Sequence, residues 1–182
     1  MQTRRSVTAL LFCVSAFAGA ARAIDAESDR WLSLRRFMGD WTGIASGQAS
    51  DGFVMRMYSF IMAERFVQEI NTTRYPPQEK NKGGEVHEHW GVFSYDKARK
   101  LVVLRQFHAE GFVNTYRLAD SLEGTGSLVF DSEAFENFSN SWKARESYEF
   151  MSDDEFVEPF ELAAPGKPFR VYSRNHFKRV AR

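Results

Sequence analysis

The chain of 182 residues carries 24 basic and 24 acidic side chains, which gives a formal net charge of zero at neutral pH. This balance lacks the excess of positive charge with which nucleic-acid-binding proteins contact phosphates, so we expect no nucleic-acid partner. The single cysteine, Cys13, excludes an intramolecular disulfide and any site built from several thiolates. Aromatic residues make up 15% of the chain, and this abundance of rings favours half-buried β-strands.

Residues 1–23 have the pattern of a secretory signal peptide. Arg4 and Arg5 form a basic start, an apolar run follows over residues 7–17, and small residues lead to Ala23. The apolar run is shorter than the roughly 20 residues that a membrane-spanning helix needs. We therefore predict cleavage after Ala23, export to the periplasm or beyond, and one mature domain over residues 24–182 without a membrane span. A retained N-terminal anchor is the alternative.

Next in the chain, the spacing of Trp31, Leu34 and Met38 predicts one short helix that begins near residues 28–29 and ends at Gly39. Beyond this glycine the apolar period changes to two, which is typical of β-strands bounded by turns. The predicted strands cover residues 41–48, 53–62, 65–75, 85–96, 101–109, 112–119, 127–134, 141–150, 155–164 and 169–180.

Short strands joined by short connections favour an antiparallel meander. A meander of this length is best closed into a barrel, because closure removes the exposed edges of the sheet. We therefore predict an all-β, antiparallel, up-and-down barrel of about nine to ten strands with a short N-terminal helix. A barrel of this size can hold one small ligand.

Polar side chains fall on the predicted apolar faces. If residues 110–111 form a two-residue turn, Arg105 and Asn114 share a face with Phe107 and Tyr116. A buried charge costs several kcal/mol unless it is paired, so this mixture predicts a ligand cavity rather than a solid core. Arg105 would hold a carboxylate or other polar head group, with Asn114 beside it.

Later strands repeat this mixture of aromatic and acidic side chains. The further residues predicted to line the cavity are Trp142, Glu146, Tyr148, Glu158 and Phe160. Two other interpretations stay open. The charged side chains could pair with one another in a filled barrel, or the faces could be assigned one residue out of register, which inverts every face.

Glu146 and Glu158 lie on neighbouring predicted strands and suggest a second alternative, a small barrel enzyme. Two carboxylates in a pocket of low dielectric constant can have their pKa values pushed apart and serve as acid and base. No nucleophile accompanies them, so we predict no catalytic residues and favour binding over catalysis. An interaction module with a filled barrel and no ligand is a further alternative.

The four histidines offer weak metal-binding signals. His87 and His89 share one face of a strand, a spacing that can begin a zinc or copper site. No cysteine supports such a site, and we interpret the two as a solvent-facing pair beside the loop at residues 76–84. His108, near a turn, and His176, among polar residues, are interpreted as surface residues.

Two stretches resemble a known family. The run FMGDWTGIASG, residues 37–47, resembles the entry of calycin barrels, in particular nitrobindin-like heme-binding domains and related uncharacterised secreted bacterial barrels. Residues 160–180 resemble their last hairpin, where a Gly-x-Pro turn precedes the closing strand. The resemblance implies a ten-stranded barrel that binds ferric heme through a histidine in that strand. Just after the turn this chain has Val171 and Tyr172, so the implied heme ligand is His176 or, failing that, Tyr172.

The sequence thus predicts an exported protein, periplasmic or secreted, that binds a small apolar or amphipathic molecule such as a fatty acid. A heme-binding nitrobindin-like barrel is the first alternative, and heme is the one cofactor that enters the prediction. Neither the identity of the ligand nor the oligomeric state follows from the sequence.

Overall fold

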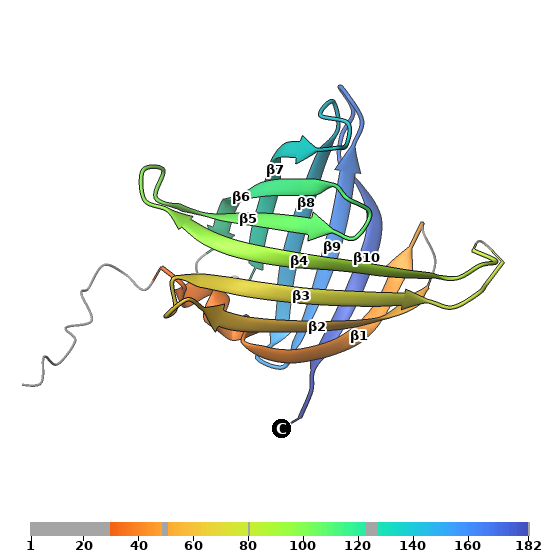
Figure 1. The fold of residues 1–182 in the computed structure, drawn as a ribbon, viewed down its shortest axis with the longest axis horizontal. Helices are drawn as coiled ribbons and strands as arrows, with labels where there is room; N and C mark the ends of the chain where they lie inside the picture. Colours follow the sequence, from red (N-terminus) through yellow and green to blue (C-terminus); the bar gives the residue numbers. More distant parts are fainter. Residues whose placement is uncertain (1–29, 49–50, 80, 123–126, 182) are drawn as a thin grey trace, which may run out of the picture.

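Ten antiparallel strands close into one barrel (Figure 1). The structure is a computed structural model that describes residues 30–48, 51–79, 81–122 and 127–181. In chain order the elements are the 3₁₀ helix η1 (Leu32–Phe37) and the strands β1 (Gly39–Gly47), β2 (Gly52–Ile61), β3 (Phe66–Tyr75), β4 (Glu85–Asp96), β5 (Leu101–His108), β6 (Val113–Leu122), β7 (Ser127–Glu136), β8 (Lys143–Ser152), β9 (Glu155–Ala163) and β10 (Arg170–Arg179). Each strand pairs with its neighbours in the chain, and β1 pairs with β10 to close the ring.

This architecture confirms the predicted up-and-down barrel with a short N-terminal helix. The helix is a single 3₁₀ segment and is shorter than predicted. Gly39 begins β1 with a φ of 114°, a conformation that glycine adopts without strain. Within the described part of the chain, no helix is long and apolar enough to cross a membrane. The predicted signal peptide, residues 1–23, lies outside the described residues.

Helix η1 and the residue before it close one end of the barrel with apolar side chains. Trp31, Leu34 and Phe37 are buried there. The ring of Phe37 packs against Tyr58 at a centroid distance of 4.9 Å and against Tyr148 at 5.0 Å. Each such aromatic pair adds about 0.5–1.5 kcal/mol beyond the burial of its area. This end of the interior is therefore a packed core.

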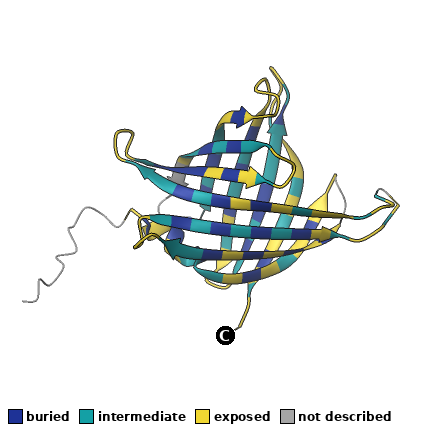
Figure 2. Ribbon diagram, viewed as in Figure 1, coloured by how far each residue is buried: buried dark blue, intermediate teal, exposed yellow. Residues whose placement is uncertain are grey.

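The interior changes character along the barrel axis. Buried and exposed residues alternate along the strands (Figure 2). On β2 the buried residues are Val54, Arg56 and Tyr58, and on β3 they include Val67 and Glu69. Aromatic rings fill the half near η1, whereas charged and amide side chains occupy the inward positions beyond it. The inner face of the barrel therefore carries polar as well as apolar residues, as the sequence predicted.

The hairpin between β5 and β6 inverts one predicted face. Its loop spans residues 109–111, and its glycine has a left-handed φ of 89°, as three-residue hairpin loops require. Gln106 therefore lies opposite Asn114, whereas a two-residue turn would place Phe107 there. Because side chains alternate with period two, this single residue turns Gln106 inward and Arg105 outward.

Candidate functional site

The end of the barrel opposite η1 holds a cavity of about 360 Å³. Polar groups surround its inner part, and its outer part combines aromatic and aliphatic groups with the exposed Glu85 and Glu110. The polar lining includes Arg56, Asn71, Gln106, Asn114, Glu146 and Glu158. The apolar lining includes Phe112, Phe135, Phe138, Phe160, Leu162 and Tyr172. Such a pairing of apolar walls with a few convergent polar groups is typical of small-molecule sites.

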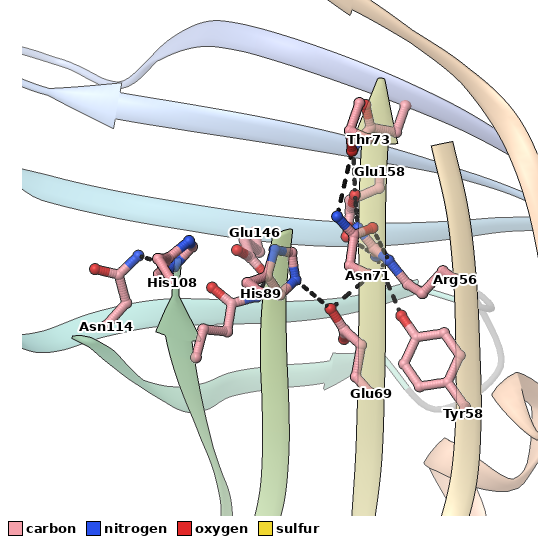
Figure 3. Close-up of polar contacts among 12 residues, drawn as sticks. Arg56, Tyr58, Glu69, Asn71, Thr73, His89, His108, Asn114, Glu146 and Glu158 are labelled. Carbon is pink, nitrogen blue, oxygen red and sulfur yellow. Dashed lines mark hydrogen bonds and ion pairs between the residues drawn. The ribbon is translucent and has the colours of Figure 1, made fainter. Parts of the chain in front are cut away.

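A buried ion pair between Arg56 and Glu158 lies at the base of the cavity (Figure 3). Arg56 donates from Nη1 to Glu158 Oε1, from Nη2 to Glu158 Oε2 at 3.0 Å, and from Nε to Asn71 Oδ1 at 2.9 Å. Burial opposes the positive charge, but the nearby negative charges, chiefly that of Glu158, raise the pKa of Arg56 well above its usual value. Arg56 also donates to Tyr58 Oη, so most of its donors bind within the protein and its charge is already paired with Glu158.

Glu146 provides a second carboxyl group on the cavity wall, and unlike Glu158 it has no arginine partner among the residues that the structure describes. Gln106 Nε2 and Tyr148 Oη both donate to its Oε2, at 3.1 and 3.0 Å. Burial, followed by the negative charges of Glu158 and Glu69, raises the pKa of Glu146 to about 8. Glu146 is therefore protonated at neutral pH and can donate a hydrogen bond to a ligand.

Three histidines converge on one wall of the cavity. His87 and His89 lie two residues apart on β4 and so share a face, and His108 lies directly opposite His89 on β5. The ring centroids are 5.1 Å apart for His89 and His108, 5.3 Å for His87 and His108, and 5.7 Å for His87 and His89. One nitrogen of each ring lies within 4.8 Å of the other two. The prediction that these histidines face the solvent is therefore wrong.

A further polar group contacts each of the three rings. The contacts join His89 Nε2 to Glu69 Oε1 at 2.7 Å, His87 Nδ1 to Glu110 Oε1 at 2.7 Å, and His108 Nε2 to the side-chain amide of Asn114 at 3.2 Å. Among the described residues, the buried side-chain atoms without a hydrogen-bond partner are Glu69 Oε2, His89 Nδ1, His108 Nδ1 and Asn114 Oδ1. These contacts fix the orientation of the rings and leave one nitrogen of each available.

The charges around this wall follow from burial and from pairing. Burial opposes the charge on Glu69, but Arg56 and the hydrogen bond with His89 outweigh it and lower the pKa of Glu69 to about 2. Burial, with the charges of His89 and His87, lowers the pKa of His108 to about 3. At neutral pH the carboxylate of Glu69 is therefore ionised and the imidazole of His108 is neutral.

Several residues predicted from the sequence line the cavity. They are Asn114, Tyr116, Glu146, Glu158 and Phe160. Tyr148 is fully buried but lies nearer η1, with its ring against Phe37 and its hydroxyl on Glu146. The ligand-binding role of all these residues stays a prediction.

Three other predicted lining residues face the solvent, and for them the prediction is wrong. Arg105 is exposed and donates from Nη1 to Ser94 Oγ at 3.1 Å. Phe107 is 48% exposed and lies beside Trp90 of β4 on the outer surface, which accounts for its apolar character. The three-residue loop shifts the register and inverts both positions. Trp142 is 40% exposed because it precedes β8, where the alternation of the strand does not yet apply.

Sequence reasoning missed Arg56, Glu69 and the histidine cluster. Arg56 alternates with buried apolar residues on β2. A search for charged side chains on apolar strand faces, as made for the β5–β6 hairpin, could have found it. The histidine cluster left a weaker signal, because His108 joins His89 only through the pairing of β4 with β5. The register of that pairing is not visible in a single chain.

Comparison with known proteins supports the fold. No protein-family profile matches the chain, and no curated protein sequence matches it. Among solved structures, the chain is similar to the crystal structure of Rv2717c from M. tuberculosis, with a TM-score of 0.63 and 15% sequence identity. The similarity covers 85% of this chain and 99% of that chain. At this identity the similarity shows the fold alone.

The histidine of the closing strand does not fit the heme site that the family resemblance implies. His176 lies on the outer face of β10, and its Nε2 is 2.6 Å from Glu155 Oε1. Its neighbour Asn175 is the residue that lines the cavity. This outward position agrees with the interpretation of His176 as a surface residue; its role as a heme ligand stays a prediction, which the position does not support. Tyr172 does line the cavity, and its role as a fallback ligand stays a prediction.

Proposed function

We propose that this protein is an exported barrel that binds a small, largely apolar molecule with a hydrogen-bonding head group. Export is proposed from the signal-peptide pattern of residues 1–23. The observation that carries the binding proposal is the cavity of about 360 Å³, polar inside and aromatic at its outer part. This volume lies at the lower end of the range for ligand sites, so we propose a compact ligand.

The charges at the base of the cavity favour an uncharged or cationic head group. The carboxylates of Glu69 and Glu158 both pair with Arg56. One positive charge is thus shared between two acidic side chains. A ligand carboxylate would meet a net negative base without a free cation. Protonated Glu146, with the amide of Asn114, instead supports hydrogen bonding to a hydroxyl, carbonyl or amine. We therefore replace the predicted carboxylate head with one of these groups.

The outer part of the cavity supports an apolar body. Phe112, Phe138, Phe160 and Leu162 provide its wall. Burying apolar surface against such groups stabilises a complex by about 25 cal/mol per Å² before the costs of association are subtracted. A flat or short hydrocarbon body would use this wall fully.

A catalytic role for the two carboxyl groups has less support. Glu158 accepts hydrogen bonds from Arg56 and also from Asn175 Nδ2, at 2.7 Å. These contacts engage both oxygens of the Glu158 carboxylate within the protein. Glu146 therefore has no matched partner for acid–base catalysis.

Fluorescence titration with 2-aminoanthracene tests the proposal, since this probe joins an apolar body to a small amine. Ala144 is buried and lines the cavity, so Ala144→Leu fills part of it. We expect the dissociation constant of the probe to be at least tenfold larger for that variant than for the wild-type protein. Ser147→Leu adds the same side chain to β8 between two inward residues and is the matched control, with expected unchanged affinity.

Equal affinity in both variants, or no saturable binding to the wild-type protein, would contradict the proposal. Competition with anthracene-2-carboxylate tests the head group. We expect it to displace the probe poorly, and displacement at equal concentration would contradict the argument from charge.

A further inference from the structure

We propose that His87, His89 and His108 bind one divalent transition-metal ion, with zinc as the best fit to the donors. A fourth position would open into the cavity. The proposal rests on these side chains alone, so it can fail or hold independently of the organic ligand proposed above.

The backbone places the three imidazoles where a tetrahedral ion needs them. Their candidate nitrogens lie within 4.8 Å of one another. Zinc–nitrogen bonds of 2.0–2.1 Å in a tetrahedron place ligand nitrogens about 3.4 Å apart. The rings must therefore approach by at most about 1.4 Å, which side-chain rotation can provide. The pairing of β4 with β5 keeps the backbones of His89 and His108 opposite each other while the side chains rotate.

The hydrogen bonds of the rings select the nitrogen that each would use. His89 donates from Nε2 to Glu69, which leaves Nδ1 as the ligand atom. His87 donates from Nδ1 to Glu110, which leaves Nε2. Metal-binding histidines usually donate their second N–H to a carboxylate or carbonyl in this manner, because the contact orients the ring and increases its basicity.

His108 completes the set through Asn114. The amide lies 3.2 Å from His108 Nε2 and 3.1 Å from Tyr116 Oη. In the structure Asn114 Nδ2 faces both groups and donates to the phenol oxygen, while Asn114 Oδ1 has no hydrogen-bond partner among the described residues. Exchanging the amide oxygen and nitrogen would let Oδ1 accept from the Nε2–H of His108 and from the phenol, and His108 Nδ1 would then carry the free lone pair. Each of the three rings would then have one oxygen acceptor and one nitrogen that this acceptor does not use.

Two of the four buried atoms that lack a hydrogen-bond partner in the described part of the chain are histidine nitrogens on this wall, and they point to a ligand here. The Nδ1 atoms of His89 and His108 are buried and lack hydrogen-bond partners. Buried polar atoms in native proteins are almost always satisfied, so two of them facing one cavity require an explanation. A bound ion would satisfy both at once, whereas a filled protein core would not.

The electrostatic environment favours a cation. Besides the protonated Glu146, the cavity lining contains three glutamates, Glu85, Glu110 and Glu158, and one arginine, Arg56. The three donors are neutral nitrogen atoms, which suit zinc, copper, nickel or cobalt, whereas calcium and magnesium prefer oxygen. Three protein ligands with one open position are also typical of zinc sites that bind water or a further ligand.

Metal titration of the purified full chain tests this proposal. The protein is treated with EDTA, desalted, and titrated with zinc chloride by calorimetry, and Co²⁺ replaces zinc for absorption spectroscopy. We expect one ion per chain and the intense visible bands of four- or five-coordinate Co²⁺. His89→Gln and His108→Gln should each weaken zinc binding at least 100-fold. Glu110→Ala, which removes the acceptor of His87, should weaken it about 10–100-fold.

His176→Gln is the matched control, because His176 also contacts a glutamate but lies on the outer face. Its zinc affinity should equal that of the wild-type protein. The proposal is overturned if the wild-type protein does not bind zinc stoichiometrically, or if both cavity variants keep its affinity, which would indicate adventitious surface binding. If His89→Gln fails to fold, the less buried His108→Gln and the Co²⁺ spectrum decide. Weak six-coordinate bands would also overturn the proposal.

Discussion

Replacing Arg56 with leucine should destabilise the fold strongly, whereas the same replacement at Arg105 should change stability little. Both arginines lie within strands among apolar residues, and only the register separates them. Arg56 is 4% exposed and donates to Glu158, Asn71 and Tyr58. Arg105 is exposed, with a side-chain hydrogen bond to Ser94.

The expected magnitude follows from what each change leaves behind. Arg56→Leu leaves Glu158 buried without its counter-charge, and breaking a buried ion pair in this way costs about 3–5 kcal/mol. It also removes the guanidinium that lies 4.5 Å from the centroid of the Phe177 ring. For a domain of this size, each kcal/mol lowers the melting temperature by about 2–4 °C, so we expect a fall of about 6–20 °C. Arg105→Leu, at the surface, should stay within about 0.5 kcal/mol of the wild-type protein.

Urea unfolding followed by tryptophan fluorescence measures both free energies of unfolding. The double variant Arg56→Leu/Glu158→Leu should recover much of the lost stability, because it removes the uncompensated carboxylate as well. Similar losses for Arg56→Leu and Arg105→Leu, or a double variant as unstable as Arg56→Leu alone, would refute the reasoning about this ion pair.

Three further predictions concern other parts of the barrel. Glu146 has a pKa of about 8 in the folded protein against an ordinary value of 4.5, so between these values the folded state binds the extra proton and stability falls as pH rises. The melting temperature of the wild-type protein should therefore fall from pH 5 to 8 relative to that of Glu146→Gln, and parallel curves would contradict the assignment. Phe37→Ala should lower the free energy of unfolding in urea by about 3–5 kcal/mol. Below its melting temperature this variant should bind 2-aminoanthracene with a dissociation constant within about threefold of the wild-type value, since Phe37 lies at the opposite end of the barrel. Loss of binding in the folded variant would contradict the separation of a packed end from a ligand-binding end. Phe107→Ser should leave both stability and probe affinity nearly unchanged, and a large loss of affinity would restore Phe107 to the site.

The fold could be predicted because its signals are local. Alternating apolar residues and turn residues mark each strand, and consecutive short connections determine which strands pair. The packed end was also visible in part, since Trp31 and Leu34 repeat with helical spacing and are both buried beside Phe37. These patterns do not depend on contacts between distant parts of the chain.

The site was predicted only in part, because it depends on registers that a single sequence does not show. Asn114 was placed correctly on β6, but the same prediction placed Arg105 inward, since it assumed two loop residues where the chain uses three. The histidine cluster needs the pairing of β4 with β5 to bring His108 beside His89. The ion pair of Arg56 with Glu158 joins strands 102 residues apart in the chain. Such contacts follow from closure of the barrel and not from local spacing.

A crystal structure of the protein with 2-aminoanthracene tests the central claim, a ligand cavity in the end of the barrel opposite η1, most directly. The account predicts electron density for the probe inside the barrel, with its ring against Phe160 and its amine toward Glu146 and Asn114. The ion pair of Arg56 with Glu158 should remain intact beneath it. Density for the probe on the outer surface beside Trp90, with the cavity filled by protein side chains, would contradict the account.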